Sequence, residues 1–110
     1  MSKHMASIEI YGNCVDDFEV SPFESINMLH RRSDLERVSL ELSYEERMKL
    51  LSYDMKLVKN SERMSKQIGE VYDFALSKEP LSQWWWHLDK VANGKIAFDL
   101  SPTFEADLEI

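Results

Sequence analysis

The longest regular pattern of apolar and polar positions runs from residue 43 to residue 80. Apolar residues recur there at alternating steps of four and three, which places them on one face of a helix. They are Tyr44, Met48, Leu51, Met55 and Val58. Ser43 and Glu46 have the spacing of a capping box, so the helix is expected to begin at this point. We expect its apolar face to point into the core.

The pattern changes phase near residue 60. The next apolar positions are Met64, Ile68, Val71 and Ala75, which do not continue the first face. The chain therefore forms either one helix with a three-residue stammer or two helices that break at Asn60-Ser61. An unbroken helix over residues 44–78 would be about 52 Å long, whereas a compact chain of this length has a radius of gyration of about 13 Å. We favour the helix pair, because the unbroken helix would overhang the domain and would need a homodimer to cover it.

Three shorter stretches alternate between apolar and polar residues, which is typical of strands. They are Ile8–Tyr11, Arg37–Leu42 and Lys95–Leu100. A turn at Gly12-Asn13 is expected to join the first of them to a partner strand within residues 15–20. A capping box at Ser21, followed by Pro22, predicts a helix that continues to about Arg32. The predicted fold class is therefore α+β: a small, mainly helical domain with a short antiparallel sheet.

The two ends of the chain are interpreted differently from the middle. Residues 1–7 resemble a cloning scar, and we set them aside in predicting the fold. Residues 8–100 are expected to form the single domain, which suits a chain of 110 residues. Residues 101–110 mix acidic with apolar side chains, contain no Lys or Arg, and are interpreted as an acidic tail.

Three consecutive tryptophans lie between Pro80 and Gly94, in a segment that we expect to be helical. Successive residues of a helix point about 100° apart, so Trp84, Trp85 and Trp86 cannot all enter one core. Tryptophan is enriched in the residues that dominate binding energies. We therefore expect Trp86 to lie at an interface.

The composition excludes several classes of partner and location. The net charge is −7, and only residues 26–70 have more Lys and Arg than Asp and Glu, nine against eight. Nucleic-acid binding usually needs a basic surface, so it is not favoured. No apolar run approaches the ~20 residues that span a bilayer. The single cysteine, Cys14, suits a reducing compartment, and we expect a cytoplasmic protein.

The sequence contains no recognisable catalytic or metal-binding motif. Its three glycines do not form a phosphate-binding loop, and no Ser-His-Asp, Cys-His or zinc spacing is present. On a helix, His87 and Asp89 would diverge by about 200° and could not share a ligand. We therefore expect a protein that is not an enzyme and that has no cofactor and no metal.

The first functional hypothesis is a non-catalytic, acidic modulator that binds a basic protein partner. Inhibitors, immunity proteins and antitoxins that mask a nuclease are of this general kind. The exposed tryptophan and the acidic tail would form the contact, with apolar side chains as anchors and carboxylates steering the partner. The predicted contact residues are Trp85, Trp86, His87, Phe104, Glu105, Asp107, Leu108 and Glu109.

The second hypothesis rests on a resemblance. The segment Arg37-Val38-Ser39-Leu40-Glu41-Leu42, followed by two helices that break near Asn60-Ser61, resembles the ribbon-helix-helix repressors. The resemblance extends from Glu36 to Ser77. It implies a dimer whose two-stranded ribbon enters the DNA major groove, with Arg37, Ser39 and Glu41 as the polar side chains of the ribbon. Arg31 and Arg32, which precede this segment, are further candidates for contacting DNA phosphates. A third hypothesis is a self-associating structural protein built on a continuous helix.

Overall fold

The computed structural model describes residues 3–96, and the regular elements of this part of the chain are all helices, joined by turns and loops, without a strand. Its elements in chain order are α1 (Met5–Gly12), α2 (Pro22–Arg37), η1 (Ser39–Glu41), α3 (Tyr44–Lys59), α4 (Ser61–Ile68), η2 (Phe74–Leu76), η3 (Trp84–His87) and α5 (Leu88–Ala92), where η marks a 3₁₀ helix. The protein is therefore a small all-helical domain. The predicted α+β class, with its antiparallel sheet, is wrong.

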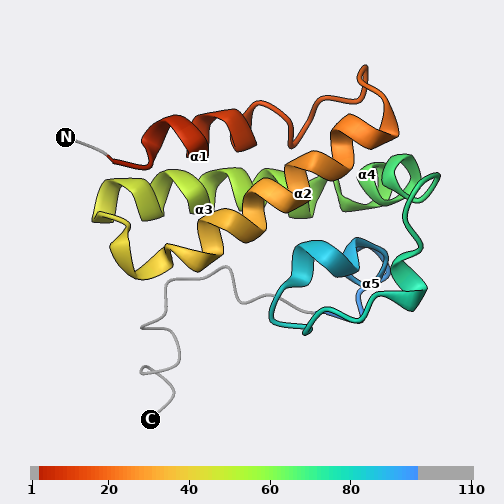
Figure 1. Cartoon of the computed structure of the whole chain (residues 1–110). Helices are drawn as coiled ribbons and strands as arrows, with labels where there is room; N and C mark the ends of the chain where they lie inside the picture. Colours follow the sequence, from red (N-terminus) through yellow and green to blue (C-terminus); the bar gives the residue numbers. More distant parts are fainter. Residues whose placement is uncertain (1–2, 97–110) are drawn as a thin grey trace, which may run out of the picture.

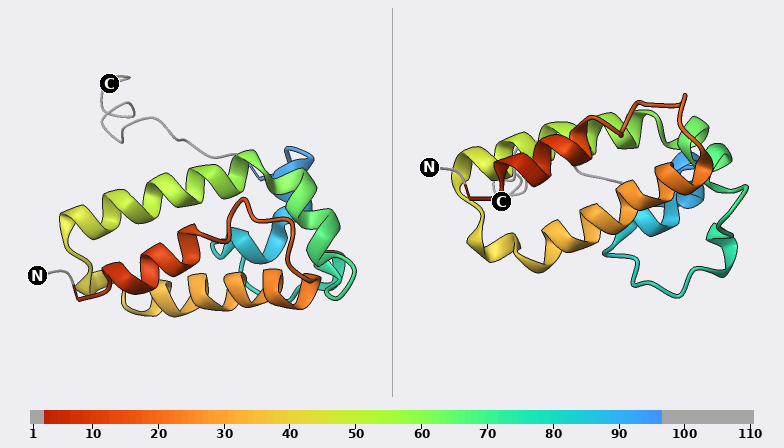
Figure 2. Two further views of the ribbon diagram at one scale, coloured as in Figure 1. Left: turned by 90° about the horizontal axis from the view of Figure 1, so that it is seen from above. Right: turned by 45° about the horizontal axis from the view of Figure 1, so that its top comes forward.

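The three N-terminal α-helices run along one another, and α1 lies over the line between α2 and α3 (Figures 1 and 2). Accordingly, α1 contacts both of these helices. At the other end of the molecule, α4 packs against both α2 and α5. The molecule measures 42 × 37 × 23 Å along its principal axes. None of the helices within residues 3–96 is long and apolar enough to traverse a bilayer.

In the described residues, the three segments predicted to be strands adopt other structures. Ile8 and Tyr11 are three residues apart and lie on one face of α1, where both are fully buried. In the segment Arg37–Leu42, η1 forms instead of a strand, and Leu40 points into solvent. Lys95 and Ile96 form a bend, and residues 97–100 of that expected strand lie outside the described residues.

The predicted helix starts and the predicted break are confirmed. Capping boxes begin α2 at Ser21 and α3 at Ser43, each with the predicted Glu three residues later. Helix α3 ends at Lys59, Asn60 separates the two helices, and α4 begins at Ser61. The second helix is shorter than expected, because the chain leaves the helical path at Gly69 and the pair does not reach residue 78.

Residues 4–7 belong to the fold, although they resemble a cloning scar. Helix α1 begins at Met5, and the backbone N–H of His4 donates a hydrogen bond of 2.6 Å to the Glu46 carboxylate of α3. Glu46 also accepts from the backbone N–H of Ser43 at 2.8 Å. One carboxylate therefore caps α3 and holds the start of α1 against it.

Close approach between α1 and α3 depends on the last residue of α1. A Cβ atom at Gly12 would lie 2.3 Å from the ring of Tyr53, a distance that carbon atoms do not tolerate. The hydroxyl of Tyr53 donates to the carboxylate of Glu9, one turn earlier in α1. The missing side chain at Gly12 thus makes room for a ring that is hydrogen-bonded to the same helix.

The buried face of α3 is the opposite of the predicted one. Glu46, Leu50 and Leu57 are buried against the rest of the domain. The predicted core face is exposed: Tyr44 retains 76% of its accessible surface, Met48 47%, Leu51 44% and Met55 41%. Helix α3 therefore has two apolar faces, and the shorter one packs into the domain.

Candidate functional site

Two of the three tryptophans are fixed inside the molecule by a serine of α2. Ser33 Oγ accepts hydrogen bonds from the indole Nε1 of Trp85 at 2.9 Å and of Trp86 at 2.8 Å. This is possible because the tryptophans lie on η3 rather than on a regular α-helix. Trp85 is 1% exposed and Trp86 is 6% exposed, whereas Trp84 is half-buried and meets the Trp85 ring edge-on. The sequence suggested an exposed Trp86, and the structure buries most of its surface.

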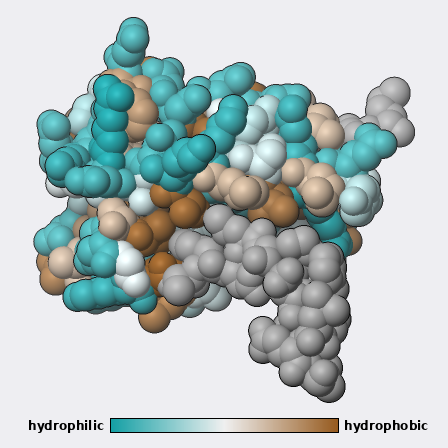
Figure 3. Space-filling model, turned by 180° about the vertical axis from the view of Figure 1, so that it is seen from behind, coloured by the Kyte–Doolittle hydropathy of each residue, from teal (hydrophilic) through white to brown (hydrophobic). Residues whose placement is uncertain are grey.

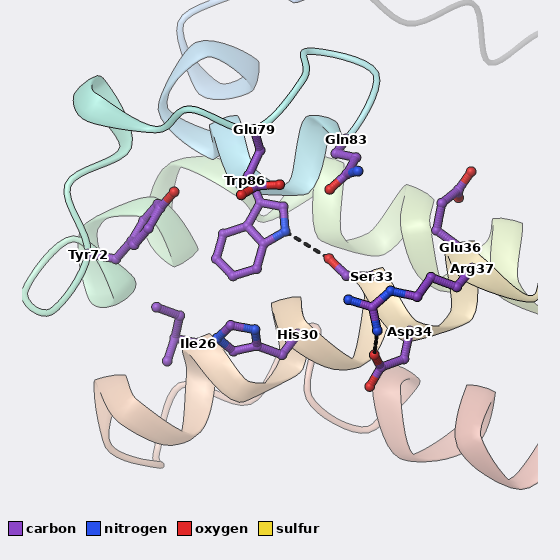
Figure 4. A pocket seen from close by; sticks show the side chains of 10 residues that line it. All are labelled: Ile26, His30, Ser33, Asp34, Glu36, Arg37, Tyr72, Glu79, Gln83 and Trp86. Carbon is purple, nitrogen blue, oxygen red and sulfur yellow. Dashed lines mark hydrogen bonds and ion pairs between the residues drawn. The ribbon is translucent and has the colours of Figure 1, made fainter.

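The remaining edge of Trp86 lines a groove between α2 and the segment that follows α4 (Figure 4). The groove has a volume of about 500 Å³. Its α2 wall consists of Ile26, His30, Ser33, Asp34, Glu36 and Arg37, and its other wall consists of Tyr72, Glu79, Gln83 and Trp86. We call this the Trp86 groove.

Aromatic rings form the inner part of the Trp86 groove. The His30 ring meets the Trp86 indole edge-on, with centroids 4.9 Å apart, and the Tyr72 ring lies 5.2 Å from the same indole. The Tyr72 hydroxyl donates to Ser77 Oγ at 2.7 Å, which fixes the ring. Figure 4 shows these three rings facing the same space. They present π faces and edges to whatever enters.

Charged side chains form the rim of the Trp86 groove, and most of them are acidic. Asp34, Glu36 and Glu79 contribute three carboxylates against the single guanidinium of Arg37. Arg37 pairs with Asp34 at 2.5 Å. The lining therefore carries an excess of negative charge beside an aromatic surface.

A buried ion pair supports this wall of α2 from behind. The Arg32 guanidinium donates two hydrogen bonds of 2.9 Å to the Asp54 carboxylate of α3, and one of 3.0 Å to Glu36. The Tyr11 hydroxyl of α1 also donates to Asp54, at 2.5 Å. Arg32 lies 4.3 Å from the Trp85 ring centroid. The Arg32–Asp54 pair thus joins α1, α2 and α3 to the tryptophan segment.

Burial changes the titration of this cluster. It raises the pKa of the Tyr11 hydroxyl well above its ordinary value, and the nearby Asp54 carboxylate raises it further. Burial also raises the pKa of the Asp54 carboxyl, although the Arg32 guanidinium acts in the opposite direction. The Tyr11 hydroxyl therefore remains a hydrogen-bond donor across the physiological pH range.

His87, which was predicted as a contact residue, holds the groove wall together. Its Nε2 donates to the backbone carbonyl of Glu79 at 2.7 Å, and the residue is 3% exposed. Within residues 3–96, its Nδ1 atom is buried without a hydrogen-bond partner. The ring thus joins the loop at Glu79 to η3, and little of its surface is exposed.

The outer face of α3 is the second candidate surface. Figure 3 views the molecule from behind, where α3 lies in front of α2, and shows tan and brown apolar residues in a band across this side. The exposed apolar side chains that α3 contributes are Tyr44, Met48, Leu51 and Met55. Val58 is half-buried and, with Met55 and two lysines, borders a shallow hollow of about 240 Å³. We call Tyr44, Met48, Leu51, Met55 and Val58 the outer stripe of α3.

The other residues predicted to contact a protein partner or DNA do not form a site within residues 3–96. Phe104, Glu105, Asp107, Leu108 and Glu109 lie outside the described residues. Of the residues expected to contact DNA, Arg32 is buried and paired with Asp54, Arg37 pairs with Asp34, and Arg31 is exposed. The backbone carbonyl of Ser39 accepts from Arg47 at 3.3 Å. Since residues 37–42 form no strand, the ribbon implied by the resemblance to ribbon-helix-helix repressors is absent from the described part of the chain.

Sequence reasoning missed the residues that shape the groove. In the sequence, His30 precedes two arginines, and Ser33 has the Ser-x-x-Glu spacing of a helix cap, so neither residue indicates a groove. Their partners Trp85 and Trp86 follow Ser33 by 52 and 53 residues, which no local pattern encodes. The second face of α3 did leave a signal, because Leu50 and Leu57 are seven residues apart on the side opposite the outer stripe.

Comparisons of the chain with protein-family models, with curated proteins and with solved structures give no match.

Proposed function

We propose that this chain is a non-catalytic protein-binding domain that receives a basic segment of a partner protein in the Trp86 groove. The observation that carries this proposal is one groove with an aromatic interior and a rim of three carboxylates against one guanidinium. The partner would be inhibited or masked at its basic segment, as in the class of acidic modulators.

An arginine or lysine side chain suits both parts of this groove. Its aliphatic stem would pack on the exposed edge of Trp86 and on Tyr72, and its charged head would interact with the rings and the rim. A guanidinium binds carboxylates with charge-assisted hydrogen bonds, and Glu79 is an exposed carboxylate on the rim. The net charge of −7 would attract a basic segment from a distance.

The experiment is a calorimetric titration with an arginine-rich peptide. The comparison peptide has the same length, with neutral citrulline in place of each arginine. We expect the arginine peptide to bind, to shift the NMR signal of the Trp86 indole N–H, and to lose affinity as salt is added.

The substitution Glu79→Gln removes one rim charge and is expected to weaken binding about threefold. The matched control is Glu62→Gln, on the exposed surface of α4 away from the groove. Equal binding of the citrulline peptide would contradict the proposal, and so would an unshifted Trp86 signal.

A further inference from the structure

Helix α3 packs into the domain by one face, and no other element within residues 3–96 covers its second apolar face. Leu50 and Leu57 are buried, whereas four residues of the outer stripe are each more than 40% exposed. Stabilising contacts with α1 and α4 already form on the inner side. The outer stripe therefore keeps apolar surface among residues 3–96 that a second molecule could bury.

The spacing of the outer stripe is that of a helix-packing seam. Steps of four, three, four and three correspond to alternating a and d positions of a heptad pattern, which interlock with a second helix. The helix is 16 residues long, so the seam is about 24 Å long. Because the domain already holds α3 as a helix, pairing would not have to induce its folding. Methionine at two of the five positions adapts to a facing surface.

Charged residues beside the outer stripe indicate what kind of helix can pack against it. Glu45 in the first turn and Lys59 in the last turn flank the same edge of the stripe, and both are exposed. An opposing helix must therefore place a cation near Glu45 and an anion near Lys59. A second copy of α3 that runs antiparallel to the first places its Lys59 near Glu45 and its Glu45 near Lys59. In this arrangement the two helix dipoles also point in opposite directions.

We infer that the outer stripe of α3 binds the outer stripe of a second copy of this chain in an antiparallel, twofold-symmetric pair. In this register, Leu51 packs opposite Met55 of the second copy, and Met48 packs opposite Val58 of the second copy. Glu45 then lies beside Lys59 of the second copy, and the symmetry repeats each contact. The seam is short, so the dimer is weak and depends on protein concentration.

This surface is distinct from the proposed peptide-binding site. Helix α3 contributes no residue to the lining of the Trp86 groove, which is formed by α2 and by residues 72–86. Each copy in the pair would keep its groove open. The inference does not depend on the proposed function, and either one stands if the other fails.

Charge reversal on the full chain tests the partner and its direction together. Glu45→Lys alone places two lysines near each other at both ends of the pair, and Lys59→Glu alone does the same with two glutamates. We expect each single variant to weaken dimerisation about tenfold, and the double variant E45K/K59E to restore most of it. The measurement is the dimerisation constant from sedimentation equilibrium at low salt.

Lys66→Glu provides the matched control, because Lys66 is an exposed lysine in the last turn of α4 and lies outside α3 altogether. It is expected to leave the dimer intact and to give no rescue of Glu45→Lys. Circular dichroism and thermal unfolding verify that every variant keeps its fold. An unchanged constant in both single variants, a double variant no better than the singles, or a wild-type chain that stays monomeric at millimolar concentration would each overturn the inference.

Discussion

At the scale of single residues, Arg32 connects more of the molecule than any local pattern suggests. Its guanidinium lies between the Asp54 carboxylate and the Trp85 ring, and its Nη1 reaches Glu36. Buried ion pairs contribute less to stability than their contacts imply, because both charges lose water on burial. Removing Asp54 would nevertheless take two hydrogen bonds from the buried Arg32 guanidinium and the acceptor from the Tyr11 hydroxyl, which is costly.

We therefore predict that Asp54→Ala lowers the free energy of unfolding by about 3–5 kcal/mol. Asp34→Ala removes the partner of Arg37 in an exposed pair and should cost less than about 1 kcal/mol. Urea unfolding followed by circular dichroism measures both values. Similar values for the two variants would show that the Arg32–Asp54 pair is not effectively buried.

The Glu46 carboxyl makes the stability of the folded domain depend on pH. The backbone N–H groups of Ser43 and His4 lower the pKa of the Glu46 carboxyl in the folded state. A carboxyl whose pKa is lower when folded stabilises the fold above its unfolded pKa. That contribution is lost as the pH falls through the lower, folded pKa.

We predict that Glu46→Gln is less stable than wild type at neutral pH and that this difference shrinks as the pH falls through the lowered, folded-state pKa of the Glu46 carboxyl. Glu45→Gln, one residue earlier and exposed, should follow the wild-type curve much more closely. Thermal unfolding across a pH series measures this dependence. A constant difference between Glu46→Gln and wild type at every pH would contradict the assigned role of the carboxylate.

Residue roles were predictable where the interaction is local. The Ser-x-x-Glu spacing identified the caps at Ser21 and Ser43, because each cap joins residues three positions apart. Ser33 and Glu36 have the same spacing, yet Ser33 lies within α2 and accepts hydrogen bonds from two indole N–H groups. Only the tertiary arrangement decides which of these two uses a serine has.

At the scale of elements, the contact between α1 and α3 depends on the absence of a side chain at Gly12. We predict that Gly12→Ala destabilises the domain by about 1–3 kcal/mol, because the added methyl group would clash with the Tyr53 ring. Alanine is otherwise the better helix former, so the direction of the effect identifies the clash. Chemical unfolding of Gly12→Ala provides the test.

The double variant G12A/Y53A is the control for this contact. If the clash with the ring is the cause, the added alanine should cost much less when Tyr53 is absent, which a double-mutant cycle measures. An equal cost of Gly12→Ala in both backgrounds would indicate a different origin for the destabilisation.

Helices were predicted more successfully than strands because their signals are longer. The 16-residue helix α3 supports a repeated pattern, whereas Ile8–Tyr11 offers four residues, too few to distinguish alternation from one helical face. The pattern on α3 also identified its apolar positions without showing what covers them. Both the outer stripe and the pair Leu50 and Leu57 satisfy helical spacing, and only the packing of α1 and α4 selects the inner face.

At the scale of the whole molecule, the domain presents two separate surfaces. The Trp86 groove carries an acidic rim on an acidic protein, which favours a basic ligand. The outer stripe is apolar and carries self-complementary charge, which favours a second copy. A dimer with two open grooves would bind a partner with repeated basic segments more tightly than either domain alone.

The central claim is that the outer stripe of α3 is a contact surface for another copy, and sedimentation velocity over a series of protein concentrations tests it most directly. The account predicts that the average mass of the wild-type chain rises from monomer toward dimer with concentration. It also predicts that Leu51→Glu abolishes this rise, while Leu76→Glu, at a leucine of η2 that is 73% exposed, leaves it intact. A wild-type chain that stays monomeric throughout the series, or a Leu51→Glu variant that dimerises like wild type, would contradict the account.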